Sequence, residues 1–119
     1  MPRARNCLNV PATCGVIFTW ELSMTTNRPK AVATRQVDNE RVIITEWRFE
    51  PGAETGWHKH AYDYIVVPGM NGNLLLETTE GNSIAELKAG QSYFRSVGVE
   101  HNVVNANDFE FYFVEIELR

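Results

Sequence analysis

The sequence predicts one compact all-β domain, and three observations support this class. Apolar and polar residues alternate with period two from Val32 onward. Turn residues interrupt this alternation roughly every eight to twelve positions, as in sandwiches and barrels. No convincing helical periodicity, internal repeat or low-complexity segment accompanies it. With 119 residues, 44% of them hydrophobic, the chain can bury an adequate core without disulfide bonds.

The first clear strand is expected from Arg41 to Glu50, because Pro51 and Gly52 end the alternation there. Arg48 falls on the solvent side of this strand. The opposite face carries Ile43, Thr45, Trp47 and Phe49. Further breaks are expected at Pro68-Gly69, Gly72, Gly81-Asn82, Gly90, Gly98 and 105–108.

The last predicted strand, Phe109 to Leu118, alternates without a slip and is largely apolar on both faces. A strand of this kind needs cover on both sides, so it is either central in a sandwich or part of a subunit interface. We therefore expect a homodimer.

Charge and composition exclude several function classes. The formal net charge of -4 and the scattered basic residues argue against binding to nucleic acid or anionic lipid. No apolar stretch is long enough to cross a bilayer. Cys7 and Cys14 are the only cysteines, so a disulfide-built secreted fold is not expected. We expect a soluble, cytoplasmic protein that acts on a small molecule.

Residues 1–23 differ from the rest of the chain and contain both cysteines. They lack the long apolar core and cleavage site of a secretory signal. We interpret 1–23 as an N-terminal extension of uncertain status, upstream of a natural start at Met24, with the domain at 24–119. The alternative is a short arm that packs on a partner subunit through Phe18 and Trp20.

The three histidines are the most informative feature of the sequence. His58 and His60 are two residues apart, so on an extended strand both imidazoles project the same way. His101 follows a distant turn and could complete a facial set of ligands for a borderline divalent metal. The alternative is that each histidine is a hydrogen-bonded core residue.

Two spaced motifs favour the metal site. In the first, Gly52 precedes His58 by five intervening residues, and Gly69 closes the motif beyond His60. In the second, the spacing runs Gly90, Ser96, Gly98, His101, Asn105, with Ser96 in place of the usual proline. Together the motifs resemble those of the cupin superfamily. The resemblance implies a double-stranded β-helix, or jelly-roll barrel, with His58, His60 and His101 on the three histidine ligand positions.

The sequence departs from the cupin pattern at Tyr64, where the family usually has a ligating glutamate. Strand parity predicts that Tyr62 and Tyr64 share the face of the histidines and that Asp63 points away. A phenol with an ordinary pKa near 10 is a poor metal ligand at neutral pH. We therefore expect Tyr64 near the metal as a catalytic hydrogen-bond donor; the alternative role is packing against the barrel wall.

Three-histidine cupins that resemble this arrangement, the thiol dioxygenases and acetylacetone dioxygenase, use ferrous iron. Three neutral ligands leave the metal charge uncompensated, which favours an anionic substrate. Arg95 and Tyr62 are the candidates to bind it, ahead of Arg48. The run after Met24 also resembles the small bacterial cupins of the β-alanine degradation protein BauB group.

Three hypotheses follow. The first is a non-haem Fe(II) dioxygenase-type oxidoreductase acting on a small anionic metabolite, possibly in β-alanine catabolism. The second is an isomerase or lyase that uses Zn, Ni or Mn at the same site. The third is a non-catalytic accessory or sensor protein that binds a metabolite or a metal.

Overall fold

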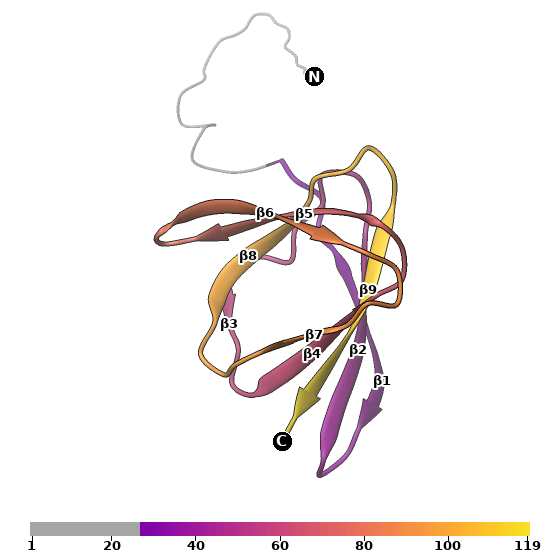
Figure 1. The fold of residues 1–119 in the computed structure, drawn as a ribbon, viewed down its shortest axis with the longest axis vertical. Coiled ribbons are helices and arrows are strands. Elements are labelled where there is room, and N and C mark those ends of the chain that lie inside the picture. The colour runs from indigo at the N-terminus through magenta and orange to yellow at the C-terminus, as the bar shows by residue number, and fades with distance from the viewer. Residues whose placement is uncertain (1–26) are drawn as a thin grey trace, which may run out of the picture.

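The computed structural model describes residues 27–119, and this part of the chain consists of strands and connecting turns (Figure 1). The predicted extension at 1–23 lies outside the described residues. Within 27–119, no helix is long and apolar enough to cross a membrane. The nine strands are β1 (Val32–Asp38), β2 (Val42–Phe49), β3 (His58–Lys59), β4 (Asp63–Pro68), β5 (Gly72–Thr78), β6 (Gly81–Leu87), β7 (Tyr93–Arg95), β8 (Glu100–Asn105) and β9 (Phe111–Leu118).

The strands form two antiparallel sheets. The first has five strands in the order β1-β2-β9-β4-β7, and the second has four in the order β3-β8-β5-β6. The crossovers place strands that are distant in sequence side by side, with β9 between β2 and β4. This arrangement is the jelly-roll fold that the sequence predicts.

The five-stranded sheet confirms the predicted alternation. Ile43, Thr45 and Phe49 are buried on the inner face of β2, while Arg48 lies on the outer face and pairs with Glu46. β9 is a central strand and pairs with β2 along its whole length. It begins at Phe111 and not at the predicted 109, because the chain bends over residues 107–109 before it joins the sheet.

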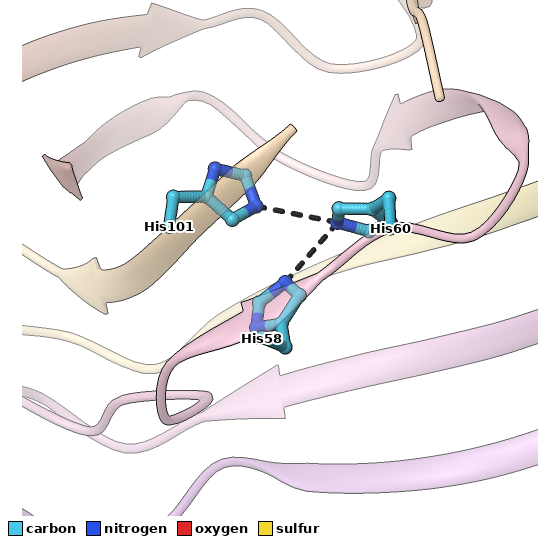
Figure 2. Close-up of side chains that lie close together, drawn as sticks. All are labelled: His58, His60 and His101. Atoms are coloured by element: carbon cyan, nitrogen blue, oxygen red, sulfur yellow. Dashed lines mark hydrogen bonds between the residues drawn. The ribbon is translucent and has the colours of Figure 1, made fainter. Parts of the chain in front are cut away.

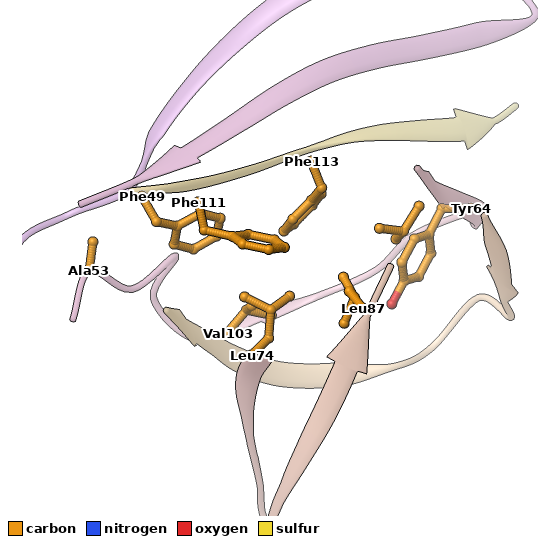
Figure 3. Packing of buried hydrophobic residues seen from close by; sticks show 9 residues of the cluster. Phe49, Ala53, Tyr64, Leu74, Leu87, Val103, Phe111 and Phe113 are labelled. Atoms are coloured by element: carbon orange, nitrogen blue, oxygen red, sulfur yellow. The ribbon is translucent and has the colours of Figure 1, made fainter. Parts of the chain in front are cut away.

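The hydrophobic core lies between the two sheets (Figure 3). Phe49 and Phe111, from neighbouring strands of the first sheet, are fully buried and face Leu74 of the second. Burial of such side chains stabilises the fold by roughly 1.5–3 kcal/mol each. The other buried members of the cluster are Ala53, Tyr64, Val66, Leu87, Val103 and Phe113.

Asn105, the last residue of the second motif, has a structural role. Its side-chain amide is buried and donates hydrogen bonds to the carbonyls of Phe49, Glu50 and Phe109, at 3.3, 3.1 and 2.9 Å. These bonds join the end of β2 to the turn before β9. The asparagine thereby satisfies buried backbone carbonyls where the two sheets meet.

Candidate metal centre

The two motifs bring the three histidines to one point inside the barrel mouth (Figure 2). His58 in β3 lies directly opposite His101 in β8. His60 follows β3, where its backbone N–H donates to the Val99 carbonyl at 2.8 Å and its carbonyl accepts from Gly98 N–H at 2.9 Å. The Nε2 atoms of His58 and His60 are 3.1 Å apart, and those of His60 and His101 are 3.3 Å apart.

These separations fit a shared metal ion. Two ligand nitrogens about 2.1 Å from one ion, at an angle of about 90–110°, lie roughly 3.0–3.4 Å from each other. His58 Nδ1 must carry its proton, because it lies 2.8 Å from the Gly56 carbonyl oxygen, which can only accept. His58 Nε2 is then an unprotonated donor atom aimed at the other two rings. The cluster fits a divalent metal by its donor set and its spacing.

Burial keeps two of the ligands unprotonated. It lowers the pKa of His60 to about 4, with a further contribution from neighbouring His58. Burial, again followed by His58, also lowers the pKa of His101 to about 4. Metal ions bind neutral imidazole, so these two rings are ready to bind a metal at neutral pH without releasing a proton.

A hydrogen-bond network fixes the His58 side of the centre. Gly56 N–H donates to the side-chain oxygen of Asn102 at 2.8 Å, and the Gly56 carbonyl accepts from His58. Gly56 has φ of +91°, a conformation that L side chains rarely adopt, so glycine suits this turn. Thr55 Oγ1 lies 3.4 Å from His58 Nδ1 and from the Asn102 oxygen. Asn102 therefore holds Gly56, the residue whose carbonyl orients the His58 ring.

The network extends from Asn102 to three charged residues. The Asn102 amide donates to Glu54 at 2.9 Å and to Glu77 at 2.8 Å. Arg28 donates to both carboxylates, at 3.2 Å to Glu54 and 3.1 Å to each oxygen of Glu77. The hydrogen bond from Arg28 lowers the pKa of the Glu77 carboxyl and keeps it ionised. The segment that leads into the barrel is thus tied, through Asn102, to the loop that carries His58.

The His60 side is different. Its Nδ1 lies 3.8 Å from Glu115 Oε2 and 4.0 Å from Glu117 Oε2, both beyond hydrogen-bond distance. Burial, followed by the nearby Glu117 carboxylate, raises the pKa of Glu115 to about 7. Trp47 donates its indole N–H to Glu115 Oε1 at 3.3 Å. Because the lowered pKa leaves the His60 ring uncharged at pH 7, the contact between His60 and Glu115 is not an ion pair.

Two cavities adjoin the histidines. The inner one, about 30 Å³, lies in the barrel and is lined by all three histidines, Tyr64, Arg95 and apolar side chains. The outer one, about 390 Å³, is lined by His58, His60, Trp47 and both glutamates of β9 among others. The two cavities share His58, His60 and Glu115, so the candidate metal position borders both.

The structure places Tyr64 and Arg95 at the site, opposite each other across β4 and β7. The Tyr64 ring is stacked on His60 with centroids 3.8 Å apart, and its hydroxyl has no hydrogen-bond partner within residues 27–119. Burial raises the pKa of Tyr64 well above its ordinary value, so the phenol stays protonated. Arg95 is exposed, and its guanidinium lies over the Tyr93 ring.

Tyr62 is not brought to the cavities. Its ring lies near Arg119, whose guanidinium carbon is 5.8 Å from the ring centroid, and it is absent from the lining of both cavities. The parity argument was wrong here because β3 ends at Lys59 and β4 starts at Asp63, so the alternation does not continue between them. Arg48 pairs with Glu46 and Glu110 on the outer face and does not reach the site.

Sequence reasoning missed Glu115 and Glu117 beside the centre. Their signal is present in the sequence, because they continue the inward parity of Phe111 and Phe113 along β9. A charged residue at an inward position of an otherwise apolar strand is unusual. The expected ligand set of three histidines stays a prediction, and two carboxyls that the sequence analysis did not name lie behind His60.

The fold and the histidine site define a cupin. A family model described as a cupin domain matches residues 45–117, and the chain belongs to this family. The match includes the strands that carry all three histidines.

Among individual proteins, the chain is 63% identical over 92 residues to the β-alanine degradation protein BauB of Pseudomonas aeruginosa, covering 77% of this chain and 97% of that protein. The crystal structure of a cupin domain from Bordetella pertussis Tohama I matches with a TM-score of 0.78 and 59% identity, over 80% of this chain and 99% of that one. The polyketide cyclase RemF of Streptomyces resistomycificus matches at 18% identity with a TM-score of 0.60, over 78% and 70% of the two chains, and shows the fold alone.

Proposed function

We propose that this cupin is a non-haem Fe(II) protein of the oxygenase type that acts on a small anionic metabolite, with His58, His60 and His101 as the iron ligands. The observation that carries the proposal is the convergence of three Nε2 atoms at spacings of 3.1 and 3.3 Å beside a cavity. Three ligands on one side of an ion leave positions open on the other side, as non-haem iron oxygenases require. The name of the BauB relative supports a place in β-alanine catabolism. The location that we propose is the cytoplasm.

When bound, the iron would supply open coordination positions and Lewis acidity. The side chains around the site would bind and orient the substrate. Tyr64 keeps its proton and can donate a hydrogen bond to a group bound near His60. Arg95 adds positive charge at the inner cavity, which favours an anion. Much of the remaining lining is apolar, formed by Val66, Leu74, Leu76, Val103 and Phe113.

Metal analysis followed by oxygen uptake tests the proposal. Protein purified without added metal or a histidine tag should contain near-stoichiometric iron, and the His58→Ala, His101→Ala double variant should contain none. Iron-loaded protein should then consume oxygen with at least one substrate among β-alanine-related acids, diketones and thiols. Oxygen uptake that stays at the buffer rate for every compound contradicts the oxygenase proposal.

The same experiment separates the two other candidates. Three imidazole nitrogens also suit Zn, Ni or Mn, so copurification of one of these metals with oxygen-independent turnover supports an isomerase or lyase. Tight metabolite binding without turnover supports a non-catalytic accessory or sensor protein.

We also propose a homodimer through the outer face of the five-stranded sheet. Register pairs place one apolar side chain from each strand in a continuous row across this face. Nothing within residues 27–119 covers the row, and Phe94 at its end is 53% exposed. An apolar row of this kind suits a two-fold interface with a second copy. The row is Val37, Ile44, Ile116, Ile65 and Phe94.

Sedimentation tests the dimer. Wild-type protein should sediment as a dimer at micromolar concentration and Ile116→Glu as a monomer, because a buried charge opposes association. A wild-type monomer contradicts the proposal.

A further inference from the structure

Glu115 is a buried carboxyl with incomplete pairing. Its side chain is 10% exposed, and Oε1 accepts a hydrogen bond from Trp47. Oε2 receives no hydrogen bond from residues 27–119, and the basic side-chain atom beside it in this part of the chain is His60 Nδ1, at 3.8 Å. Glu117 lies on the same side of His60 and likewise has no lysine or arginine within ion-pair distance in this part of the chain. Glu115 and Glu117 therefore face the same cavity, and in residues 27–119 neither carboxyl has a lysine or arginine within ion-pair distance.

That space is the outer cavity of about 390 Å³, which is lined by both glutamates and lies within the size range of small-molecule sites. A buried carboxyl that lacks a partner costs folding free energy, so such groups are typical of binding and catalytic sites. Trp47 lines the same cavity, and an indole ring attracts organic cations. The inner wall of the cavity is thus suited to a cationic group.

The rim of the cavity has the opposite charge. Arg35, with a side chain 56% exposed, and Lys59, which is also exposed, line its outer part. Arg35 is paired with Asp38 at 2.8 Å. The carboxyls are therefore deep and the cations are at the surface. A ligand that places only an anion in this cavity would meet Glu115 and Glu117 as unfavourable neighbours.

We propose that the outer cavity binds the ammonium group of a small amino acid between Glu115 and Glu117, with the ligand's carboxylate directed to the metal centre. This inference rests on the proposed function and narrows its substrate class from anions in general to zwitterionic amino acids. Two oppositely charged sites on either side of His60 would then select a ligand that carries both charges.

An organic ammonium fits this place better than a second metal ion. A metal bound by His60 Nδ1, Glu115 and Glu117 would require His60 to use both ring nitrogens as ligands and to lose its ring proton. The distances of 3.8 and 4.0 Å from Nδ1 to the carboxylate oxygens are also longer than two ligands of one small ion require. An ammonium group needs only hydrogen-bond acceptors around it, and the two carboxyls provide these.

Calorimetric titration of metal-loaded protein tests the proposal without relying on activity. The probes are glycine, β-alanine and 4-aminobutyrate, each compared with the acid of the same length that lacks the amine: acetate, propionate and butyrate. We expect at least one amino acid to bind about tenfold or more tightly than its matched acid, which is the size of effect that a charged hydrogen bond provides.

Glutamate variants then test whether the preference for amino acids over plain acids depends on Glu117. Glu117→Gln, which keeps the shape of the side chain, should reduce the ratio of the two affinities to near one without weakening the binding of the plain acid. The control Glu110→Gln, at a carboxyl paired with Arg48 on the outer face, should retain the wild-type ratio.

The outcomes separate this inference from the proposed function. If plain acids bind as tightly as amino acids, the inference is wrong and the anionic-metabolite proposal stands. If neither kind of ligand binds to protein that holds its metal, the inference is wrong, and the anionic-metabolite proposal is then decided by the diketones and thiols of the oxygen-uptake experiment. If Glu117→Gln keeps the preference, or if titration finds a second metal ion per chain that Glu117→Gln removes, the ammonium site is wrong.

Discussion

The two histidines of the first motif are held in opposite ways. His58 donates Nδ1–H to the Gly56 carbonyl at 2.8 Å, and Asn102 accepts the N–H of the same glycine. His60 has no such support: its Nδ1 faces Glu115 and Glu117 at distances too long for a hydrogen bond. His58 is fixed by the protein itself, whereas His60 borders a cavity with two carboxyls that have no lysine or arginine within ion-pair distance in residues 27–119.

This difference predicts different roles for the His58 side and the His60 side of the site. A ligand whose second ring nitrogen is hydrogen-bonded keeps its tautomer and orientation before the metal arrives. His60, which borders Glu115 and Glu117, lines the outer cavity and would contact a molecule bound there. We therefore expect the hydrogen bonds on the His58 side to contribute to metal affinity, and the His60 side to be the one that a molecule in the outer cavity contacts.

The largest expected effect is the loss of metal on removal of either histidine. His58→Ala and His60→Ala should each reduce bound metal from about one ion per chain to a small fraction, because two imidazoles hold a divalent ion weakly. Elemental analysis of the purified proteins measures this. Retention of full metal content by His60→Ala would restrict the centre to His58 and His101.

The next largest effect is expected for Asn102, which supports His58 through the hydrogen-bond network and is not itself a proposed metal ligand. Asn102→Ala removes one hydrogen-bond partner each from Glu54, Glu77 and the Gly56 N–H and should lower the free energy of unfolding by about 1–3 kcal/mol. It should also weaken metal binding by about 10- to 100-fold, the usual effect of losing such a supporting residue. Competition with a chelator measures the affinity, and Asn102→Asp, which keeps the oxygen that accepts from Gly56, should recover part of it. A loss of stability with unchanged metal affinity would contradict a positioning role.

Two arginines provide a matched pair for a smaller effect. Arg28 and Arg48 each bridge two glutamates, but Arg28 is tied to Asn102 whereas Arg48 lies on the outer face. Arg28→Ala should cost about 1 kcal/mol of stability and weaken metal binding severalfold, while Arg48→Ala should change stability by less than about 1 kcal/mol and leave metal binding unchanged. Urea unfolding and the same chelator competition compare them. Equal effects on metal affinity would show that the network does not reach the centre.

The smallest effect is on the pH dependence of stability in the metal-free protein. Between pH 4.5 and 6.5 the unfolded chain protonates His60 and His101, whose folded pKa is about 4, so stability falls as the pH falls. Glu115, with a folded pKa of about 7, opposes this because the folded state retains its proton there. Urea unfolding should give a net slope of about one proton, and Glu115→Gln should increase it toward two. An unchanged slope in the variant would contradict the assignment to Glu115.

The sequence predicted the fold and the histidine cluster because both depend on local signals. The spacing of Gly52, His58 and His60 and the second motif at 90–105 determine register within short segments. Tyr64 was expected near the histidines from strand parity, and Arg95 was named as a candidate because its positive charge suits an anionic substrate. Tyr62 was wrongly expected there, because a break between two strands leaves no periodic trace in so short a segment.

The residues that support the histidines through hydrogen bonds could not be predicted from sequence spacing. Arg28 meets Glu77 across 49 positions of sequence, and Asn102 meets Glu54 across 48. No spacing rule links residues so far apart, since only the packing of the two sheets brings them together. Glu115 could have been found, because its inward parity in β9 was already visible in the alternation of the strand.

The shortness of β3 has a thermodynamic consequence. Only His58 and Lys59 form the regular strand pair with β8, and the rest of this edge is held by single backbone hydrogen bonds, such as those from Thr55 N–H to Val103 and from His60 N–H to Val99. A metal bound by His58, His60 and His101 would tie that edge to the rest of the barrel, and its binding free energy would add to the local stability. Amide hydrogen exchange near His58 thus becomes a measure of metal occupancy, because opening of this edge and release of the ion are linked equilibria.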